Sequence, residues 1–176
     1  LNGRSVARFV DPDESTNTSN GDGDFLDVPT PSIGANESYT YFLIANLTAD
    51  IASGSATDGS GAFLLDRPAN VSPLVSLKVV NGNYAYQTRD SDGNDLDAAT
   101  SNTAASSTFR IFGLQRDFNN QFNLYIDGGN AANVSDDGDN LTPPAPRLGS
   151  HANNDAIDGD VAEFIIVSGD LNTTRR

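Results

Sequence analysis

The sequence predicts an all-β protein, an antiparallel β-sandwich of the jelly-roll type. Nine segments rich in β-branched and aromatic residues follow one another at short intervals, and no long segment has the 3.6-residue period of a helix. Clusters of Gly, Asn, Asp, Ser and Pro separate these segments, as turns require. A chain of 176 residues with 37% hydrophobic residues can bury one sizeable core. We therefore expect a single domain over residues 1–176.

The expected strands differ in how their hydrophobic residues are arranged. In residues 121–127, the hydrophobic Phe122, Leu124 and Ile126 occupy alternate positions, which predicts a strand with one buried face. Residues 41–45 and 164–167 are apolar throughout, which predicts central strands covered on both faces. In chain order, the expected strands are residues 5–10, 24–28, 38–45, 62–66, 74–80, 83–88, 107–115, 121–127 and 161–167.

Two dipeptides predict tight hairpins. Asn81-Gly82 lies between two strand-like runs, and Asp127-Gly128 follows another; such pairs favour two-residue turns because both positions need a positive φ. Residues 99–107, ATSNTAASS, resemble a linker in composition, but expected strands flank them closely. We expect a surface loop there.

The charge of the chain argues against two classes of partner. There are 24 acidic and 10 basic residues, a formal net charge of −14. Nucleic acids and anionic membranes attract a basic face, so neither is an expected partner. The longest apolar runs are also far shorter than the roughly 20 residues of a spanning helix, so no membrane insertion is expected.

The absence of cysteine removes several chemistries. Without it the chain has no disulfides, thiolate zinc sites, iron–sulfur clusters or cysteine nucleophiles. Seven Asn-x-Ser/Thr sequons occur, at Asn17, Asn36, Asn46, Asn70, Asn133, Asn140 and Asn172. Composition alone accounts for about three. Two interpretations remain open, a decorated surface and a composition rich in Asn, Ser and Thr.

Three segments, taken in order, resemble the laminin-G-like, or concanavalin A-like, jelly-roll domains of bacterial extracellular proteins. They are residues 1–14 with GDGDFLDV (21–28), FRIFGLQRDFNNQFNLYIDGG (109–129), and PRLGSHANNDAIDGDVAEFIIVSGDLNTTRR (146–176). The resemblance implies an extracellular sandwich of about fourteen strands that often binds calcium and, in some members, glycans or proteins. This chain departs from the family by lacking the tryptophan often found in the strand that here reads FRIFGLQRD. That puts a tryptophan platform for sugar stacking in doubt.

Acidic turns are the candidate calcium sites. Aspartate and asparagine oxygens suit a hard cation, and residues 89–97 space four of them around a glycine, like the first half of an EF-hand loop. The glutamate that completes such a loop is absent, and a solvated turn is the alternative. Residues 20–25 and 136–139 are similar but weaker. The candidate metal ligands are Asp90, Asp92, Asn94, Asp97, Asp22 and Asp24.

The segment HANNDAIDGD, residues 151–160, holds the only histidine. Asp158-Gly159 resembles the turn into the last strand, so the first half of the segment is the variable loop in which a ligand would be selected. Its candidate ligand-binding residues are His151, Asn153, Asn154 and Asp155. A polar loop without a ligand is the alternative.

We expect a non-catalytic binding and adhesion module that recognises a glycan or another surface ligand, with calcium as its expected cofactor. Hydrolases of this fold need two carboxylates on one strand, and Glu163 is the only glutamate in an expected strand. The module is expected to be extracellular, monomeric and part of a larger chain. The alternatives are a structural spacer and, last, a polysaccharide-active enzyme.

Overall fold

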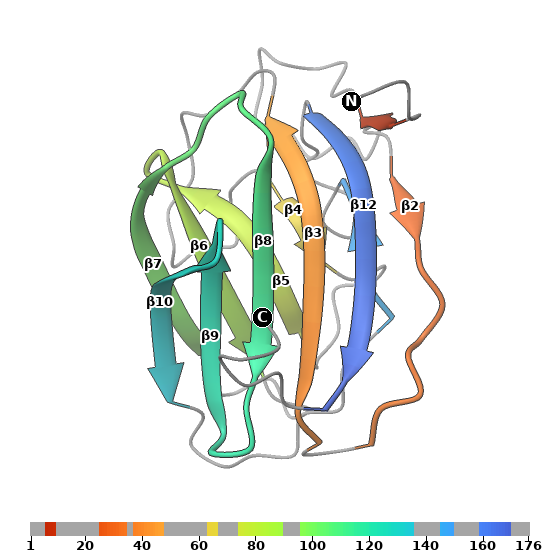
Figure 1. Cartoon of the computed structure of the whole chain (residues 1–176), viewed down its shortest axis with the longest axis vertical. Helices are drawn as coiled ribbons and strands as arrows, with labels where there is room; N and C mark the ends of the chain where they lie inside the picture. The colour runs from red at the N-terminus through yellow and green to blue at the C-terminus, as the bar shows by residue number, and fades with distance from the viewer. Residues whose placement is uncertain are drawn as a thin grey trace.

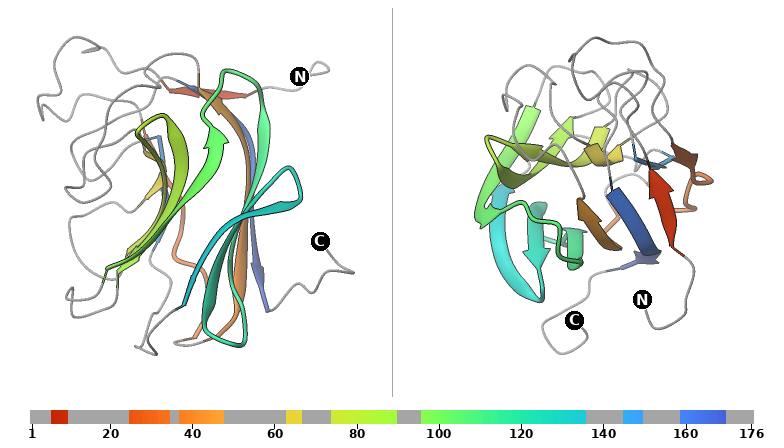
Figure 2. Two further views of the ribbon diagram at one scale, coloured as in Figure 1. Left: turned by 90° about the vertical axis from the view of Figure 1, so that its left-hand side faces the viewer. Right: turned by 90° about the horizontal axis from the view of Figure 1, so that it is seen from above.

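The computed structural model describes residues 6–9, 25–34, 37–47, 63–66, 74–89, 96–135, 145–149 and 159–169. Within these ranges the chain forms twelve strands and no helix. All strand pairs are antiparallel, and the strands form two six-stranded sheets that face each other as two layers (Figures 1 and 2). The predicted all-β antiparallel sandwich is confirmed.

The front sheet of Figure 1 has the order β1-β12-β3-β8-β9-β10. Its long central strands are adjacent in space although they come from distant parts of the chain, because β3 pairs with β12 on one side and with β8 on the other. The strands of the front sheet are β1 (Ala7–Phe9), β3 (Tyr39–Leu47), β8 (Arg110–Arg116), β9 (Gln121–Ile126), β10 (Gly129–Ser135) and β12 (Gly159–Ser168).

The back sheet has the order β2-β11-β4-β5-β6-β7. Its edge strand β7 contacts β10, the edge strand of the front sheet, so the two layers meet along this side of the sandwich. The strands of the back sheet are β2 (Leu26–Asp27), β4 (Phe63–Asp66), β5 (Leu74–Val80), β6 (Asn83–Arg89), β7 (Leu96–Ala104) and β11 (Arg147–Leu148).

The core between the sheets is built largely from tyrosine, phenylalanine and aliphatic side chains. Two edge-to-face ring pairs join the layers, Tyr84 with Phe112 at 4.8 Å between centroids and Tyr86 with Phe122 at 5.6 Å. Such pairs contribute about 0.5–1.5 kcal/mol each beyond the burial of their area. Because the chain has no tryptophan or methionine, these rings are among its largest fully buried side chains.

Both predicted hairpins are confirmed. Asn81 and Gly82 have φ of 49° and 78°, and Asp127 and Gly128 have φ of 52° and 84°, so each turn has positive φ at both central positions. The predicted alternation in β9 is also confirmed, since Phe122, Leu124 and Ile126 are at most 7% exposed.

The expected loop over residues 99–107 is wrong for its first part. Residues 99–104 belong to β7, which pairs with β6 from Arg89↔Leu96 to Asn83↔Ala104. The small polar side chains of β7 carry little strand propensity, but main-chain hydrogen bonds to β6 do not depend on them. Strands β10 and β11 were not predicted either.

Strands β3 and β12 are central, as predicted, but the described residues do not cover them on both faces. On the side away from the core, Phe42 and Ile44 of β3 are half-buried, and Ile165 of β12 is 44% exposed. Their apolar side chains therefore lie on an outer surface of the protein.

Candidate ligand-binding face

Most of the residues proposed from the sequence as ligand or metal sites lie outside the described residues. Asp97 is the exception, and only its backbone is described, in β7 opposite Thr88 of β6. In the described part of the chain, no three His, Asp or Glu side chains form a group that could hold a metal ion. The residues outside the described ranges are His151, Asn153, Asn154, Asp155, Asp90, Asp92, Asn94, Asp22 and Asp24. Calcium binding and the loop site stay predictions.

The outer face of the front sheet, by contrast, is described in detail. Alternation along each strand and the register between strands place side chains on it in rows that cross the sheet. The aromatic row runs from β12 to β10 through the partners Ile165, Phe42, Gly113, Tyr125 and Asn130. Sequence reasoning missed this row because each of its members comes from a different strand.

Gly113 lies between the two aromatic side chains of this row. A Cβ atom added there would lie 3.4 Å from Cβ of Tyr125 and 3.7 Å from Cε1 of Phe42. The glycine thus lets the two aromatic side chains approach each other over β8, one from either side. An aromatic face offers apolar surface that matches the C–H faces of a sugar ring, and such surface beside a few polar groups is the usual make-up of a small-molecule site.

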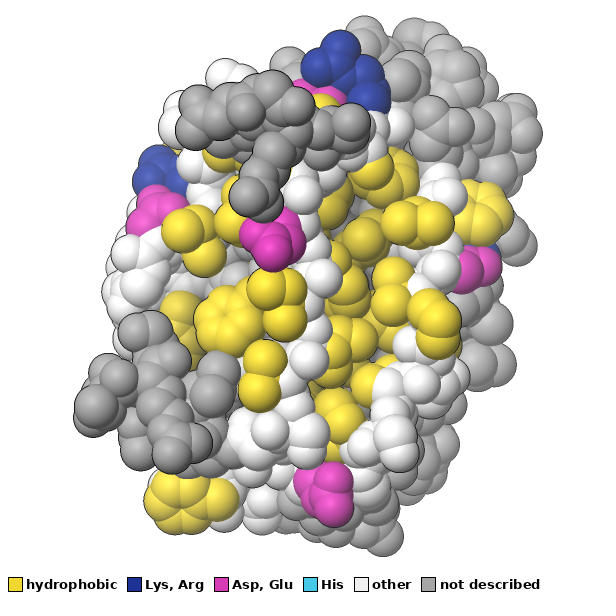
Figure 3. Space-filling model, turned by 45° about the vertical axis from the view of Figure 1, so that its right-hand side comes forward, with side chains coloured by type: hydrophobic (Ala, Val, Ile, Leu, Met, Phe, Trp, Pro, Cys, Tyr) yellow, Lys and Arg dark blue, Asp and Glu magenta, His cyan; other side chains and the backbone are white. Residues whose placement is uncertain are grey.

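Aliphatic side chains extend the apolar surface along the strands. Ile111 of β8 is 51% exposed and pairs with Ile44 of β3, while Val167 of β12 is half-buried. Figure 3, which is turned toward the β12 side of the molecule, shows hydrophobic side chains on this face and on the adjoining side of the sandwich. Exposed apolar groups concentrated on one face are typical of an interaction surface.

Asparagine side chains border the aromatic row toward β10. Asn130 Nδ2 donates a hydrogen bond to Asn123 Oδ1 at 3.4 Å, and Asn133 of β10, opposite Asn123, is exposed. Each amide offers both donors and an acceptor. This border can exchange hydrogen bonds with hydroxyl groups of a ligand without carrying charge.

Carboxylates lie at the other border of the aromatic row. Glu163 of β12 is exposed, in the row of Ile44 and Ile111. Asp127, in the turn after β9, accepts a hydrogen bond from Arg110 Nη1 at 2.5 Å and another from the backbone N–H of Ile111 at 3.1 Å. The hydrogen bond from the Ile111 N–H is the largest cause that lowers the pKa of Asp127, and the hydrogen bond from Arg110 lowers it further. The carboxylate therefore stays ionised at neutral pH.

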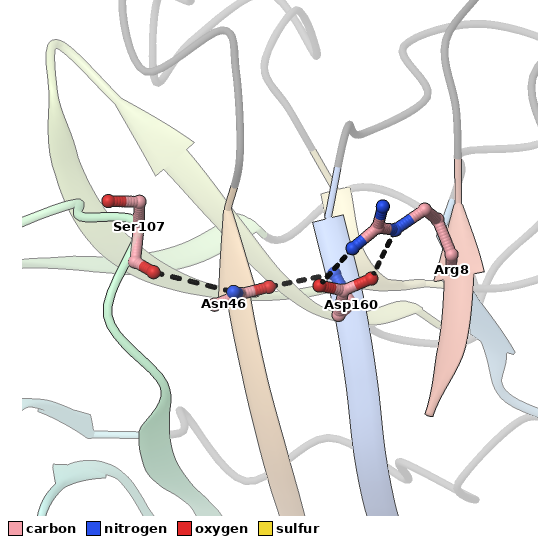
Figure 4. A network of polar contacts seen from close by, with 4 residues as sticks. All are labelled: Arg8, Asn46, Ser107 and Asp160. Atoms are coloured by element: carbon pink, nitrogen blue, oxygen red, sulfur yellow. Dashed lines mark hydrogen bonds and ion pairs between the residues drawn. The ribbon is translucent and has the colours of Figure 1, made fainter. Parts of the chain in front are cut away.

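A polar network closes the end of this face where β1, β3 and β12 meet (Figure 4). Arg8 donates two hydrogen bonds to Asp160, at 2.7 and 3.0 Å. Asn46 accepts a hydrogen bond from the backbone N–H of Asp160 at 2.9 Å and donates one to the carbonyl oxygen of Ser107 at 3.3 Å. All four residues are engaged with one another, so the network holds strands together and leaves the sequon residue Asn46 buried.

A second arginine joins the short strands at the edge of the back sheet. Arg147 of β11 donates to both carboxylate oxygens of Asp27 of β2, at 2.7 and 3.3 Å. Its guanidinium group also lies 3.8 Å from the centroid of the half-exposed Phe25 ring. Ion pairing and stacking together hold β2 against β11.

The sandwich is similar to solved carbohydrate-binding structures. One is the carbohydrate-binding module (CBM40) of the Ruminococcus gnavus IT-sialidase bound to α2,3-sialyllactose, with a TM-score of 0.61 and 14% identity over 86% of this chain and 95% of that one. Another is the botulinum neurotoxin serotype D ligand-binding domain in complex with N-acetylneuraminic acid, with a TM-score of 0.66 and 15% identity over 86% of this chain. This chain spans 38% of the length of that neurotoxin domain.

These similarities establish a shared lectin-like sandwich fold. No protein-family model matches the sequence, and no curated protein matches it. Among the described residues there is no helix long and apolar enough to cross a membrane.

Proposed function

We propose that this chain is a non-catalytic, extracellular glycan-binding module, and that the outer face of the front sheet holds the glycan. The observation that carries the proposal is the aromatic row, in which Phe42 and Tyr125 lie on either side of Gly113. The neighbours of known structure support it, because the sialidase module and the neurotoxin domain are binding domains with bound sugars. We also propose that the chain is a laminin-G-like domain and that calcium ions order its loops.

The row supplies what a glycan needs from a protein surface. Rings and aliphatic side chains lie beside amides that can donate and accept hydrogen bonds, and all are held on paired strands rather than on loops. A rigid sheet loses little conformational entropy when it binds a ligand, which favours the binding of a flexible chain of sugars.

The proposal is tested by screening the protein against an array of neutral and acidic oligosaccharides and measuring the best ligand by calorimetry. Phe42→Leu and Tyr125→Leu keep apolar bulk but remove the ring, so each should weaken binding at least about tenfold, or about 1.4 kcal/mol. Phe118→Leu is the matched control, because Phe118 is 74% exposed in the turn between β8 and β9 and lies outside the row. Its affinity should equal that of the wild type.

Gly113→Val tests the placement of the two rings. A Cβ at residue 113 already lies 3.4 Å from Tyr125 and 3.7 Å from Phe42, so the methyl groups of valine would displace the rings, and binding should be lost. If no oligosaccharide binds, or if the ring variants bind as well as the wild type, the face is not a glycan site. If no oligosaccharide on the array binds, the alternative function, a structural spacer domain, is favoured over a glycan-binding module.

A further inference from the structure

We propose that the outer face of the front sheet selects uncharged glycans over sialylated ones. This inference rests on the proposed glycan-binding function and specifies its ligand class. It separates this chain from the sialidase module and the neurotoxin domain, whose structures contain sialyllactose and N-acetylneuraminic acid. The argument starts from the charges on and around the face.

Recognition of a sialic acid carboxylate is usually the task of a cation that is free to pair with it, since an arginine forms two parallel hydrogen bonds to a carboxylate. Among the arginine side chains that the structure describes, three already have an aspartate partner. These pairs are Arg8 with Asp160, Arg110 with Asp127 and Arg147 with Asp27.

The two other cationic side chains that the structure describes are buried. Lys78 is 1% exposed, and it lies on β5 in the back sheet. Arg116 is 0% exposed; it donates to Asn120 Oδ1 at 2.9 Å and lies over the Phe122 ring. A ligand on the outer face of the front sheet reaches neither charge.

The exposed carboxylate on this face acts in the opposite sense. Glu163 is exposed one row from Phe42, whereas the charge of Asp127, at the end of the same row as Glu163, is offset by its ion pair with Arg110. The chain as a whole carries −14, which adds a repulsive background for any anion. An anionic sugar on the aromatic row would therefore meet repulsion, and the described side chains offer it no unpaired cation.

An uncharged sugar meets no such penalty. Its C–H faces match Phe42 and Tyr125, and its hydroxyl groups can bond to the exposed amides of Asn130 and Asn133. The face therefore offers apolar and neutral polar groups to a ligand, and excess negative charge only at its border.

The test uses pairs of oligosaccharides that are identical except for a terminal sialic acid, such as lactose and α2,3-sialyllactose, on an array followed by calorimetry at low salt. The uncharged member of the best-bound pair should bind at least about tenfold more tightly. The difference should shrink at about 0.5 M salt, because screening weakens repulsion between exposed charges. Tighter binding of the sialylated member would overturn the inference while leaving glycan binding intact, and no binding at all would overturn both.

A charge variant distinguishes repulsion from simple lack of fit. Glu163→Gln should improve binding of the sialylated member several-fold and leave the uncharged member unchanged. Glu37→Gln is the matched control, because it removes one exposed carboxylate far from Glu163. Glu37 lies seven residues before Ile44, the strand partner of Glu163, which corresponds to about 23 Å in an extended strand. Equal effects of the two variants on the sialylated member would contradict a local role of Glu163 and overturn the proposed cause of the selectivity.

Discussion

Asn46 Oδ1 accepts the backbone N–H of Asp160 at 2.9 Å, across 114 residues of sequence. Asn46 thus satisfies a buried donor at the start of β12, next to the ion pair between Asp160 and Arg8. The same residue begins an Asn-x-Thr sequon. Its side chain serves the fold, which distinguishes it from Asn133, the exposed sequon residue of β10.

Replacing Asn46 with Ala should destabilise the protein by about 1–3 kcal/mol, because a buried backbone donor loses its partner. Urea denaturation measures this effect. Asn133→Ala is the control and should stay within about 0.5 kcal/mol of the wild type. In a host that glycosylates sequons, mass spectrometry should find Asn46 of the folded protein unmodified; a glycan on it would contradict the assigned role.

Acid should weaken the junction of β1 and β12. The hydrogen bonds from Arg8 lower the pKa of Asp160, so the folded protein releases this proton more readily than the unfolded chain, in which the pKa of Asp is about 3.9. The stabilisation is therefore full at neutral pH and is lost as pH falls below about 4. Asp160→Asn should flatten the dependence of unfolding free energy on pH in that acidic window, as followed by urea denaturation at a series of pH values. An unchanged slope would argue against the ion pair.

The turn at Asp127-Gly128 should tolerate no side chain at its glycine. Gly128 has φ of 84° with open space around it, so Gly128→Ala changes only backbone strain and should cost about 1–2 kcal/mol. Gly129→Ala, where the added Cβ meets only the Ile126 carbonyl oxygen at 3.6 Å, should be nearly neutral. Thermal unfolding of the two variants compares them directly, and equal melting temperatures would refute the strain argument.

Two buried tyrosines should respond in opposite ways to loss of the hydroxyl. The Tyr41 hydroxyl is buried and has no hydrogen-bond partner among the described residues, so Tyr41→Phe should be neutral or stabilising by up to about 1 kcal/mol. The Tyr84 hydroxyl accepts the backbone N–H of Ser106 at 3.2 Å, so Tyr84→Phe should destabilise by about 1 kcal/mol. Chemical denaturation at neutral pH gives both values, and the same sign for both would count against this account.

The buried hydroxyl of Tyr41 should also make the folded protein less stable at alkaline pH. Burial raises the pKa of its hydroxyl, so the folded state keeps the proton that the unfolded chain loses above about pH 10. Stability is therefore full below that pH and falls above it. Tyr41→Phe should lose less stability than the wild type between about pH 9 and pH 11, measured by denaturant unfolding. An identical alkaline loss in both proteins would exclude Tyr41 as its source.

Local patterns in the sequence correctly predicted the class of the fold and several of its parts. Alternation of hydrophobic residues predicted the buried face of β9, and the pairs Asn81-Gly82 and Asp127-Gly128 predicted two tight hairpins. These features succeed because they depend on neighbouring residues, either through the two-residue period of a strand or through the dihedral angles that a turn demands.

Alternation alone misplaces Glu163. Val161 and Glu163 are two residues apart and should share a face, yet Val161 lies in the core and Glu163 is exposed. The register with β3 shifts between them, so Val161 pairs with Ala45 and Glu163 with Ile44. Such a bulge depends on the partner strand, and it turns the carboxylate toward the candidate site.

The sequence by itself determined most of the segments that extend and where two hairpins turn tightly, because short-range sterics and periodic burial decide both. Only the tertiary structure decided that Phe42, Gly113 and Tyr125 share one row, and that Arg8 meets Asp160 across 152 residues. Strand order and register arise from packing two whole sheets against each other, a property that no local window of sequence contains. The candidate ligand face is therefore a product of strand pairing, and each of its residues looks ordinary in the sequence.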